Sequence, residues 1–371
     1  MNIYLHGALF NTNFGDIIFA DIFYKKVIAL NGEQNTYFFD SKLLKTPLSE
    51  FCKNVVGYNK KQTLKNLLKA DLLIYISGGM FALLEKSWRR ATMNFLKFAV
   101  VGLLFAIRKK KVLILGVGGG PVNNRVLLLT YRYIFNHAEI VTVRNEETKE
   151  YFKKCGVKKD MEVTSDTAQI IDQSMIPPLD TNIKIKIDSK FKNKRKLFLH
   201  INDDKTRDGE MSENIIPAVN EFLSVNNDWG VVISTDKVYN GDVRILRTVK
   251  ALDKTIDIFI YPYNDPWQLC SLLNECDMVI TAKLHVGIIS AALGKSVVSF
   301  PHNKEKITRY YNQINESDRC IPLKDINPAQ ALDVLNQFCY KPINIDAAFR
   351  EKAKINLKKI DEVLKSKFNK D

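Results

Sequence analysis

A histidine at the start of a predicted helix is the sharpest candidate for catalysis in this sequence. The segment Lys283-Leu284-His285 follows an apolar run, 278–281, that is typical of a buried strand. We expect a helix to begin there, so that His285 lies in its first turn, near free backbone amides and the positive end of the helix dipole. This position favours a neutral imidazole in an empty site and an imidazolium once a phosphate or carboxylate binds. The alternative interpretation is a histidine that only caps the helix or packs.

Other basic side chains also follow predicted strands. Arg144 comes directly after the run 140–143, where a guanidinium can hold a carboxylate or phosphate in a bidentate pair. Lys304 and Lys306 follow the run 297–300. Open α/β sheets bind ligands at the carboxyl ends of their strands, so these groups are candidates for holding an anion. A surface ion pair is the ordinary alternative for any one of them.

Three glycine-containing segments are predicted to be loops between a strand and a helix. Glycines there let a backbone approach a ligand closely and leave amides free at a helix start, where an anion is stabilised. The alternatives are helix caps and tight turns. None of the three is a dinucleotide fingerprint, because the third glycine and the acidic ribose ligand are missing. The segments are Asn13-Phe14-Gly15-Asp16, Ser77-Gly78-Gly79-Met80 and Gly116-Val117-Gly118-Gly119-Gly120-Pro121.

The elements that position these residues follow an α/β pattern. Short apolar runs alternate with longer amphipathic segments, which predicts parallel strands and crossover helices. The pattern fails over 176–196, a basic stretch that begins near Pro177-Pro178 and predicts a linker. Two Rossmann-like domains are therefore expected, 1–175 with Arg144 and 197–340 with His285. The predicted strands are 3–5, 72–76, 112–115, 140–143 and 162–164, then 197–201, 231–234, 256–260, 278–281 and 297–300.

The rest of the chain, 341–371, is expected to form an amphipathic helix that packs back on a domain. Its lysines are accompanied by no nucleic-acid-binding motif, so no nucleic-acid partner is expected.

Composition limits the class of protein. The 371 residues are 46% hydrophobic and 26% charged, which excludes disorder and a disulfide scaffold. The net charge of +14 favours anionic partners. The six cysteines form no C-x-x-C pair, and Met1 runs directly into a strand-like segment. We therefore expect a cytoplasmic protein with reduced thiols and no metal site.

Taken in order, these segments resemble the polysaccharide pyruvyl transferase family. The resemblance extends over most of the chain, and it lies in the order and spacing of motifs that are individually common. The motifs are Asn13-x-Gly15-Asp16, Ser77-Gly78-Gly79, the glycine segment ending at Gly120-Pro121, Val143-Arg144, Ser165-Asp166-x-Ala168, Lys283-x-His285 and a downstream lysine.

The resemblance implies two Rossmann-like domains facing across a cleft, as in GT-B glycosyltransferases. It also implies a reaction in which the pyruvyl group of phosphoenolpyruvate moves to a sugar of a bacterial capsule or exopolysaccharide precursor. The product is a pyruvate ketal, phosphate is released, and no cofactor is needed beyond phosphoenolpyruvate as co-substrate.

The resemblance also assigns roles to residues. His285 is implied to be the catalytic acid or base, and Arg144 is implied to hold phosphoenolpyruvate together with either Lys304 or Lys306. Lys283 stands where the family has arginine, which keeps the charge but loses the bidentate fork. Two other departures from the family pattern are Met80 and Asn145. The acceptor side and its loops are implied to include Asn13, Gly15, Asp16, Gly78, Gly79, Gly118, Gly120 and Asp166.

Ketal formation requires a proton for the methylene carbon of phosphoenolpyruvate, attack by a sugar hydroxyl and loss of phosphate. Histidine titrates near neutral pH, so His285 is the predicted proton donor, or a group that assists phosphate departure. Asp166 is a candidate for the acceptor base, its alternative being a turn or cap residue.

Acceptor sugars in such pathways are often carried on a lipid diphosphate such as undecaprenyl diphosphate. The apolar stretch 98–107 covers ten residues, too few to cross a bilayer alone. It is bracketed by Trp88-Arg89-Arg90 and Arg108-Lys109-Lys110-Lys111, as an interfacial segment at the cytoplasmic membrane face would be. The alternative is a buried crossover helix.

Two other functions fit the same features. Two Rossmann-like domains with basic loops would also serve a GT-B-type glycosyltransferase that uses a nucleotide sugar. The departures at Lys283 and Met80 would also suit a non-catalytic sugar-binding or scaffold protein of polysaccharide assembly.

Overall fold

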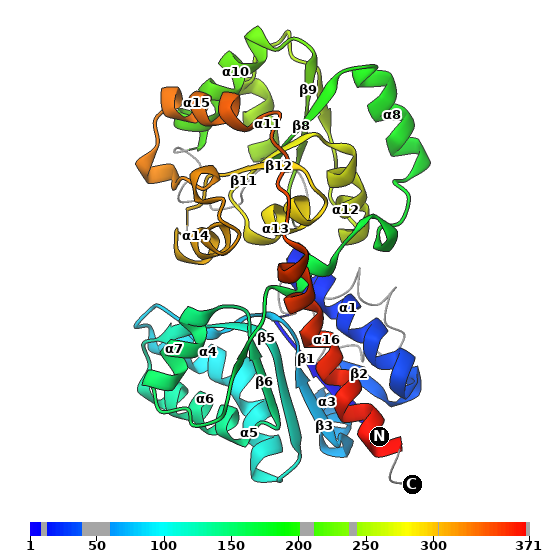
Figure 1. Ribbon diagram of the computed structural model, residues 1–371, viewed down its shortest axis with the longest axis vertical. Helices are drawn as coiled ribbons and strands as arrows, with labels where there is room; N and C mark the ends of the chain where they lie inside the picture. The colour runs from blue at the N-terminus through cyan, green and yellow to red at the C-terminus, as the bar shows by residue number, and fades with distance from the viewer. Residues whose placement is uncertain (9–12, 39–59, 201–210, 237–242, 303, 369–371) are drawn as a thin grey trace. The chain divides into compact units, whose positions relative to one another are not determined.

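The computed structural model describes residues 1–8, 13–38, 60–200, 211–236, 243–302 and 304–368. The chain divides into two compact units, each an α/β structure (Figure 1). Unit 1 combines Met1–Ile170 with Ala347–Asp371, and unit 2 is Ile171–Asp346. The expected α/β fold with two Rossmann-like parts is thus confirmed.

Unit 1 is built on a sheet of seven parallel strands among the described residues. The order along the sheet is β2-β1-β3-β5-β6-β7, and β4 pairs with β5. Its central strands are apolar on both faces, as expected for a parallel sheet covered by helices on both sides. The strands are β1 Ile3–His6, β2 Thr36–Phe38, β3 Leu72–Tyr75, β4 Gly78–Leu83, β5 Lys111–Val122, β6 Ile140–Val143 and β7 Glu162–Val163.

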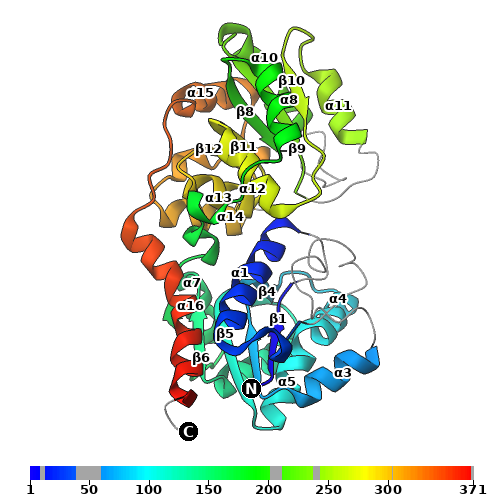
Figure 2. The same ribbon diagram turned by 90° about the vertical axis from the view of Figure 1, so that its right-hand side faces the viewer.

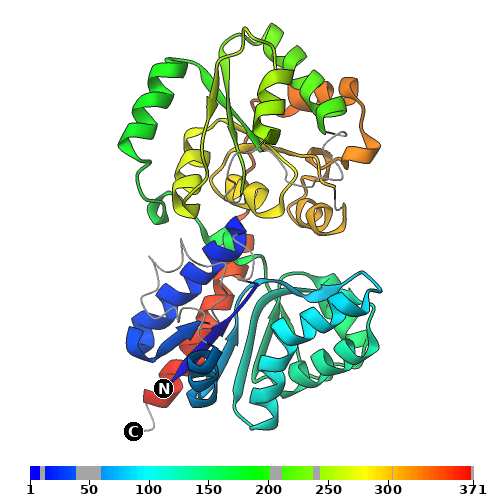
Figure 3. The ribbon, with the colours of Figure 1, turned by 180° about the vertical axis from the view of Figure 1, so that it is seen from behind.

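Two groups of helices cover this sheet. Figures 1 and 3 show α1 and α16 on one face and α4, α5 and α6 over the other. A π-helical turn, Phe95–Ala99, joins α4 to α5. The helices are α1 Phe14–Asn31, α3 Lys60–Lys69, α4 Trp88–Asn94, α5 Val100–Ile107, α6 Arg125–His137, α7 Glu146–Lys154 and α16 Ala347–Phe368.

The helical run from α4 to α5 is fixed to the sheet by a close contact at Tyr75. The hydroxyl of this buried tyrosine donates a hydrogen bond to the carbonyl oxygen of Phe98 at 2.5 Å. Gly102 makes the approach possible, because a Cβ there would lie 2.4 Å from the same hydroxyl oxygen. Buried Phe105 and Val101 continue the packed side of the run. One side of the run is therefore part of the core of unit 1, as a crossover helix would be.

The C-terminal helix α16 packs back on unit 1, as expected, and Figure 2 shows it running along the unit. Its fully buried Asn356 joins the helix to the carboxyl ends of β6 and β7. The side-chain oxygen of Asn356 accepts hydrogen bonds from Thr142 Oγ1 at 2.6 Å and Thr164 Oγ1 at 3.0 Å. Its amide nitrogen donates to the carbonyl oxygen of Ser165 at 3.2 Å and to Thr167 Oγ1 at 3.0 Å. All four polar bonds are buried, so they fix the helix in one register.

Unit 2 has a five-stranded parallel sheet with the order β10-β9-β8-β11-β12. Helices α10 and α15 pack together, and their buried side chains form the core with this sheet. The strands are β8 Arg195–His200, β9 Trp229–Ser234, β10 Ile258–Ile260, β11 Met278–Thr281 and β12 Ser296–Ser299. The helices are α8 Thr181–Phe191, α10 Ile216–Val225, α11 Val243–Ala251, α12 Pro266–Glu275, α13 Leu284–Ala292, α14 Lys304–Gln313 and α15 Pro328–Phe338.

The stretch 176–196, expected as a linker, contains helix α8 and the start of β8. Asp180 caps this helix, because its carboxylate accepts from the backbone amides of Asn182 and Ile183. Ile187 and Phe191 are buried. Most of the stretch is therefore a regular part of unit 2, in which Ile187 and Phe191 place one face of a lysine-rich helix in the core.

Candidate functional site

The candidate site in unit 2 lies at the carboxyl ends of neighbouring strands. The sheet order reverses between β8 and β11, and such a switch point is where open α/β sheets bind ligands. His200 ends β8, Asp236 follows β9, and Lys283 follows β11. His200 Nε2 lies 3.5 Å from Asp236 Oδ1, and Lys283 Nζ lies 3.8 Å from Asp236 Oδ2. A carboxylate that is 2% exposed thus lies between two basic side chains.

Lys283 is the residue immediately before α13, and its backbone amide donates to Thr281 Oγ1 at 3.0 Å. This bond fixes the turn from β11 into the helix. His285 is therefore the second residue of α13, in its first turn, as the sequence predicted. It is partly exposed, and its Nε2 atom is buried.

The start of α13 is packed tightly against α14. A Cβ at Gly287 would lie 2.8 Å from the hydroxyl oxygen of Tyr311. Burial raises the pKa of Tyr311 well above its ordinary value, so this hydroxyl stays neutral. The turn that carries His285 is consequently held by close packing on its inner side.

Tyr263 is a further buried hydroxyl near the carboxylate of the cluster. Its pKa is held well above the ordinary value by burial, and the negative charges of Asp236 and Asp265 act in the same direction. This tyrosine therefore acts only as a neutral group beside the site.

The structure describes the side chain of only one of the two lysines, Lys304 and Lys306, that the sequence offers as donor ligands. Lys306 is exposed and lies in the first turn of α14. Lys304 begins the same helix, and its side chain lies outside the described residues. Both follow β12, the strand next to β11, at the same edge of the sheet.

In unit 1, Arg144 and Asp166 form a buried ion pair. Arg144 Nη1 donates to Asp166 Oδ2 at 3.0 Å, and the other carboxylate oxygen of Asp166 accepts from the amide of Ala168. Gly118 provides the space for the guanidinium, because a Cβ there would lie 2.4 Å from Arg144 Nε. The sequence singled out all three residues without predicting that they touch.

The glycine segments after β3 and within β5 differ from the expected loops. Gly78 and Gly79 belong to β4, and Gly118 and Gly120 lie inside the long strand β5. No helix starts directly after either segment, so the predicted free amides of a helix N-terminus are not formed there. The glycines have a packing role: a Cβ at Gly120 would lie 2.4 Å from the ring of Tyr151 on α7.

The first motif does lead into a helix. Residues 9–12 lie outside the description, and α1 begins at Phe14. Asn13 makes no side-chain capping bond and instead donates from Nδ2 to Asp16 Oδ2 at 2.9 Å. Gly15 is buried in the first turn, and a Cβ at Gly78 would meet Asp16 Oδ1 at 3.7 Å. The first two motifs are thus brought together at the carboxyl edge of the sheet.

Sequence reasoning missed His200 and Asp236. His200 is the last residue of a correctly placed strand and Asp236 comes two residues after another, so the strand-end position was the available signal. Their proximity depends on the parallel pairing of β8 with β9, in which His200 is opposite Ser234.

Two Rossmann-like units with basic side chains at the carboxyl edges of their sheets define a GT-B-like α/β protein. Solved structures of this fold include UDP-GlcNAc 2-epimerase from Methanocaldococcus jannaschii, with a TM-score of 0.64 and 12% identity over 99% of this chain and 100% of that chain. The epimerase from Neisseria meningitidis bound to UDP-GlcNAc has a TM-score of 0.60 and 13% identity, with 98% and 100% covered. Anabaena Alr3699/HepE in complex with UDP has a TM-score of 0.53 and 13% identity, with 99% and 100% covered.

A comparison of the sequence with protein-family models identifies the family of this chain. The model of the family described as polysaccharide pyruvyl transferase matches residues 13–304, and the chain belongs to that family. A comparison with curated proteins gives no significant match.

Proposed function

We propose that the protein transfers the pyruvyl group of phosphoenolpyruvate to a sugar of a bacterial cell-surface polysaccharide precursor, forming a ketal and releasing phosphate. The observation that carries this proposal is the position of His285 and Lys283 at the carboxyl edge of the unit 2 sheet, in a chain of the pyruvyl transferase family. A histidine and a lysine at the start of one helix supply a proton and a positive charge to the same small anion.

In the proposed reaction, protonated His285 gives its proton to the methylene carbon of phosphoenolpyruvate, which becomes a methyl group. A sugar hydroxyl attacks the adjacent carbon and returns a proton to His285. The bond to the phosphate oxygen then breaks, and phosphate leaves with the bonding electrons. A second hydroxyl closes the ketal, and its proton leaves with the phosphate.

Positive charge in the site would neutralise the carboxylate and the phosphate of phosphoenolpyruvate. Lys283 is held beside Asp236 and remains 27% exposed at its side chain, so it can reach a bound anion. Lys306, or Lys304, would add a second charge from the neighbouring strand end. Arg144, whose orientation is set by Asp166, is proposed as a further group that holds the carboxylate or phosphate of the donor.

A nucleotide-sugar glycosyltransferase is the second candidate. The observation that favours it is that proteins of the same fold have been solved with UDP and UDP-GlcNAc bound. If the protein is such a glycosyltransferase, it will consume UDP-sugars and will not consume phosphoenolpyruvate.

The deciding experiment measures release of inorganic phosphate from phosphoenolpyruvate in the presence of galactose, glucose and N-acetylmannosamine glycosides, and of a lipid-diphosphate-linked saccharide. We expect acceptor-dependent release in the wild type and a loss of roughly 10²- to 10⁴-fold in His285→Ala. His137→Ala is the matched control, because His137 is the last residue of α6 in unit 1 and has no part in the proposed reaction. Turnover of UDP-sugars without phosphate release, or an unaffected His285→Ala, would reject the proposal.

A further inference from the structure

An exposed apolar surface covers part of unit 1, on the helices that follow β4 and β5. It consists of Trp88, Leu96, Val126, Leu129 and Tyr133, hereafter the α4–α6 surface, and each of these side chains is about half exposed or more. Trp88 and Leu96 are eight residues apart on the run that begins with α4, and Val126, Leu129 and Tyr133 follow a helical spacing on α6. Both helices therefore present apolar side chains outward.

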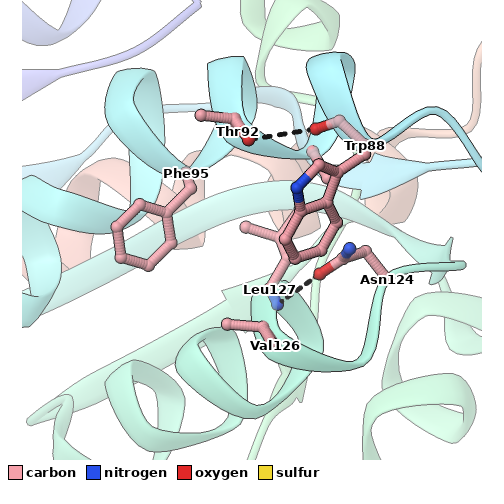
Figure 4. Close-up of a pocket in the computed structure, with 7 residues that line it drawn as sticks. Trp88, Thr92, Phe95, Asn124, Val126 and Leu127 are labelled. Atoms are coloured by element: carbon pink, nitrogen blue, oxygen red, sulfur yellow. Dashed lines mark hydrogen bonds between the residues drawn. The ribbon is translucent and has the colours of Figure 1, made fainter.

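A hollow of ≈ 170 Å³ lies between the two helices (Figure 4). Trp88 and Phe95 line it from one side, and Val126 and Leu127 line it from the other. Its lining is almost entirely apolar. A contiguous apolar surface with a hollow is unusual on a protein face that meets only water, so this face is expected to have an apolar partner.

The charges around the α4–α6 surface identify that partner. Residues 86–138 contain no aspartate or glutamate. Arg89 lies beside Trp88, Arg125 lies beside Val126, and both arginines are exposed. The Lys and Arg residues of this stretch are Lys86, Arg89, Arg90, Lys97, Arg108, Lys109, Lys110, Lys111, Arg125 and Arg132. Three of them form ion pairs with acids outside the stretch: Arg90 with Glu85, Lys110 with Asp71 and Lys111 with Glu139.

We propose that the α4–α6 surface docks on an anionic lipid bilayer, with Trp88 in the headgroup region and the arginines on lipid phosphates. Apolar area and cations on one face are the two contributions that a stable peripheral contact needs. Tryptophan is also the side chain enriched at the membrane–water interface. A second copy of the chain fits less well, since a two-fold contact would bring the exposed Arg89 and Arg125 of this surface against the same cations of the partner.

The surface lies on the bilayer and does not cross it. The run Trp88–Ile107 is, among the described residues, the one helix long and apolar enough to span a membrane, and 33% of its most apolar window is buried. This run is longer than the ten apolar residues that the sequence indicated. Its buried side is tied to the sheet through Tyr75 and Gly102, and leaving the sheet would expose that core.

The tryptophans make the proposal directly measurable. Trp88 is 67% exposed, whereas the other two in the chain, Trp229 and Trp267, are 2% and 5% exposed. Quenching by brominated phospholipid therefore reports Trp88. With the full-length protein, we expect quenching and co-sedimentation with phosphatidylcholine vesicles that contain phosphatidylglycerol, and neither with phosphatidylcholine alone. Both signals should weaken as salt is raised.

Substitutions separate the electrostatic contribution to vesicle binding from the apolar contribution. Arg89→Gln and Arg125→Gln should each weaken vesicle binding about five-fold. Leu96→Ser should weaken it at all salt concentrations. Arg247→Gln and Leu246→Ser are matched controls, because both residues are exposed on α11 in unit 2.

The proposal is overturned by a lack of binding to anionic vesicles, by binding without quenching of Trp88, by equal binding to neutral vesicles, or by vesicle binding that the control substitutions weaken equally. Self-association that buries Trp88 and excludes vesicles would assign the surface to a second copy. Because phosphate release with soluble glycosides is measured without vesicles, failure here leaves the proposed reaction untouched.

Discussion

Arg144 and Asp166 are paired at 3.0 Å in the interior of unit 1, with both side chains almost fully buried. A buried guanidinium that loses this carboxylate partner keeps a charge that is poorly solvated. We therefore expect Asp166→Asn to lower the free energy of unfolding by about 3 kcal/mol. Urea denaturation of the purified variant measures this.

The acid Glu162 provides a control, since its side chain is 43% exposed in its ion pair with Lys359. Glu162→Gln should change the free energy of unfolding by less than about 1 kcal/mol. If Asp166→Asn were as stable as this control, the buried pair would contribute nothing to unit 1.

Asp236 is predicted to position Lys283. Asp236→Asn removes the carboxylate 3.8 Å from Lys283 Nζ, so the lysine loses a partner that orients it. We expect turnover of phosphoenolpyruvate to fall roughly 10- to 100-fold. Steady-state phosphate release measures this. Asp333→Asn, an exposed change on α15, should leave turnover unchanged, and wild-type turnover in Asp236→Asn would contradict the role.

Asn356 is predicted to be the residue that attaches α16 to unit 1. Asn356→Ala leaves the hydroxyls of Thr142, Thr164 and Thr167 without this buried partner. We expect a loss of about 3 kcal/mol in the free energy of unfolding. Lys352→Ala, an exposed change on the same helix, should have almost no effect. Thermal unfolding of both variants tests this, and equal melting temperatures would refute it.

His6 makes the stability of unit 1 dependent on pH. It is fully buried at the end of β1, and its Nε2 donates to the carbonyl oxygen of Lys97 at 2.9 Å. Burial lowers its pKa from 6.5 to about 4. Between these values the unfolded chain binds a proton at His6 and the folded chain does not. The contribution of His6 to the free energy of unfolding is therefore constant above pH 6.5. It falls by about 3 kcal/mol as the pH drops towards 4.

Urea denaturation across that range measures the effect. His6→Gln should reduce the dependence on pH, whereas His137→Gln should retain it. A wild-type protein whose stability does not change between pH 6.5 and 4 would show that His6 is protonated at no cost when folded.

The strands were predictable where the chain is apolar on both faces. The bounds expected for 140–143 and 278–281 match β6 and β11, because strands buried in a parallel sheet are continuous apolar runs. Strand β4 was missed, and β5 extends beyond its expected end. Glycine weakens strand patterns in sequence, and at Gly118 and Gly120 it is present to admit side chains from elsewhere in the fold.

The candidate site was only half predictable for a similar reason. His285 could be predicted from local sequence features, because it follows a strand and lies in the first turn of a helix. Asp236 becomes meaningful only through its contacts with His200 and Lys283, which are distant in sequence. Which strand ends become neighbours is set by the sheet order, and no single segment encodes that order.

The return of the chain to unit 1 has a consequence for protein synthesis. Met1–Ile170 leaves the ribosome first, but the helix that carries Asn356 emerges only after all of unit 2. At typical elongation rates this delay is on the order of ten seconds or more. During that time the threonine hydroxyls of unit 1 lack their partner Asn356, while unit 2 can already fold. We therefore expect unit 2 to complete its native structure before unit 1, although most of unit 1 is synthesised first.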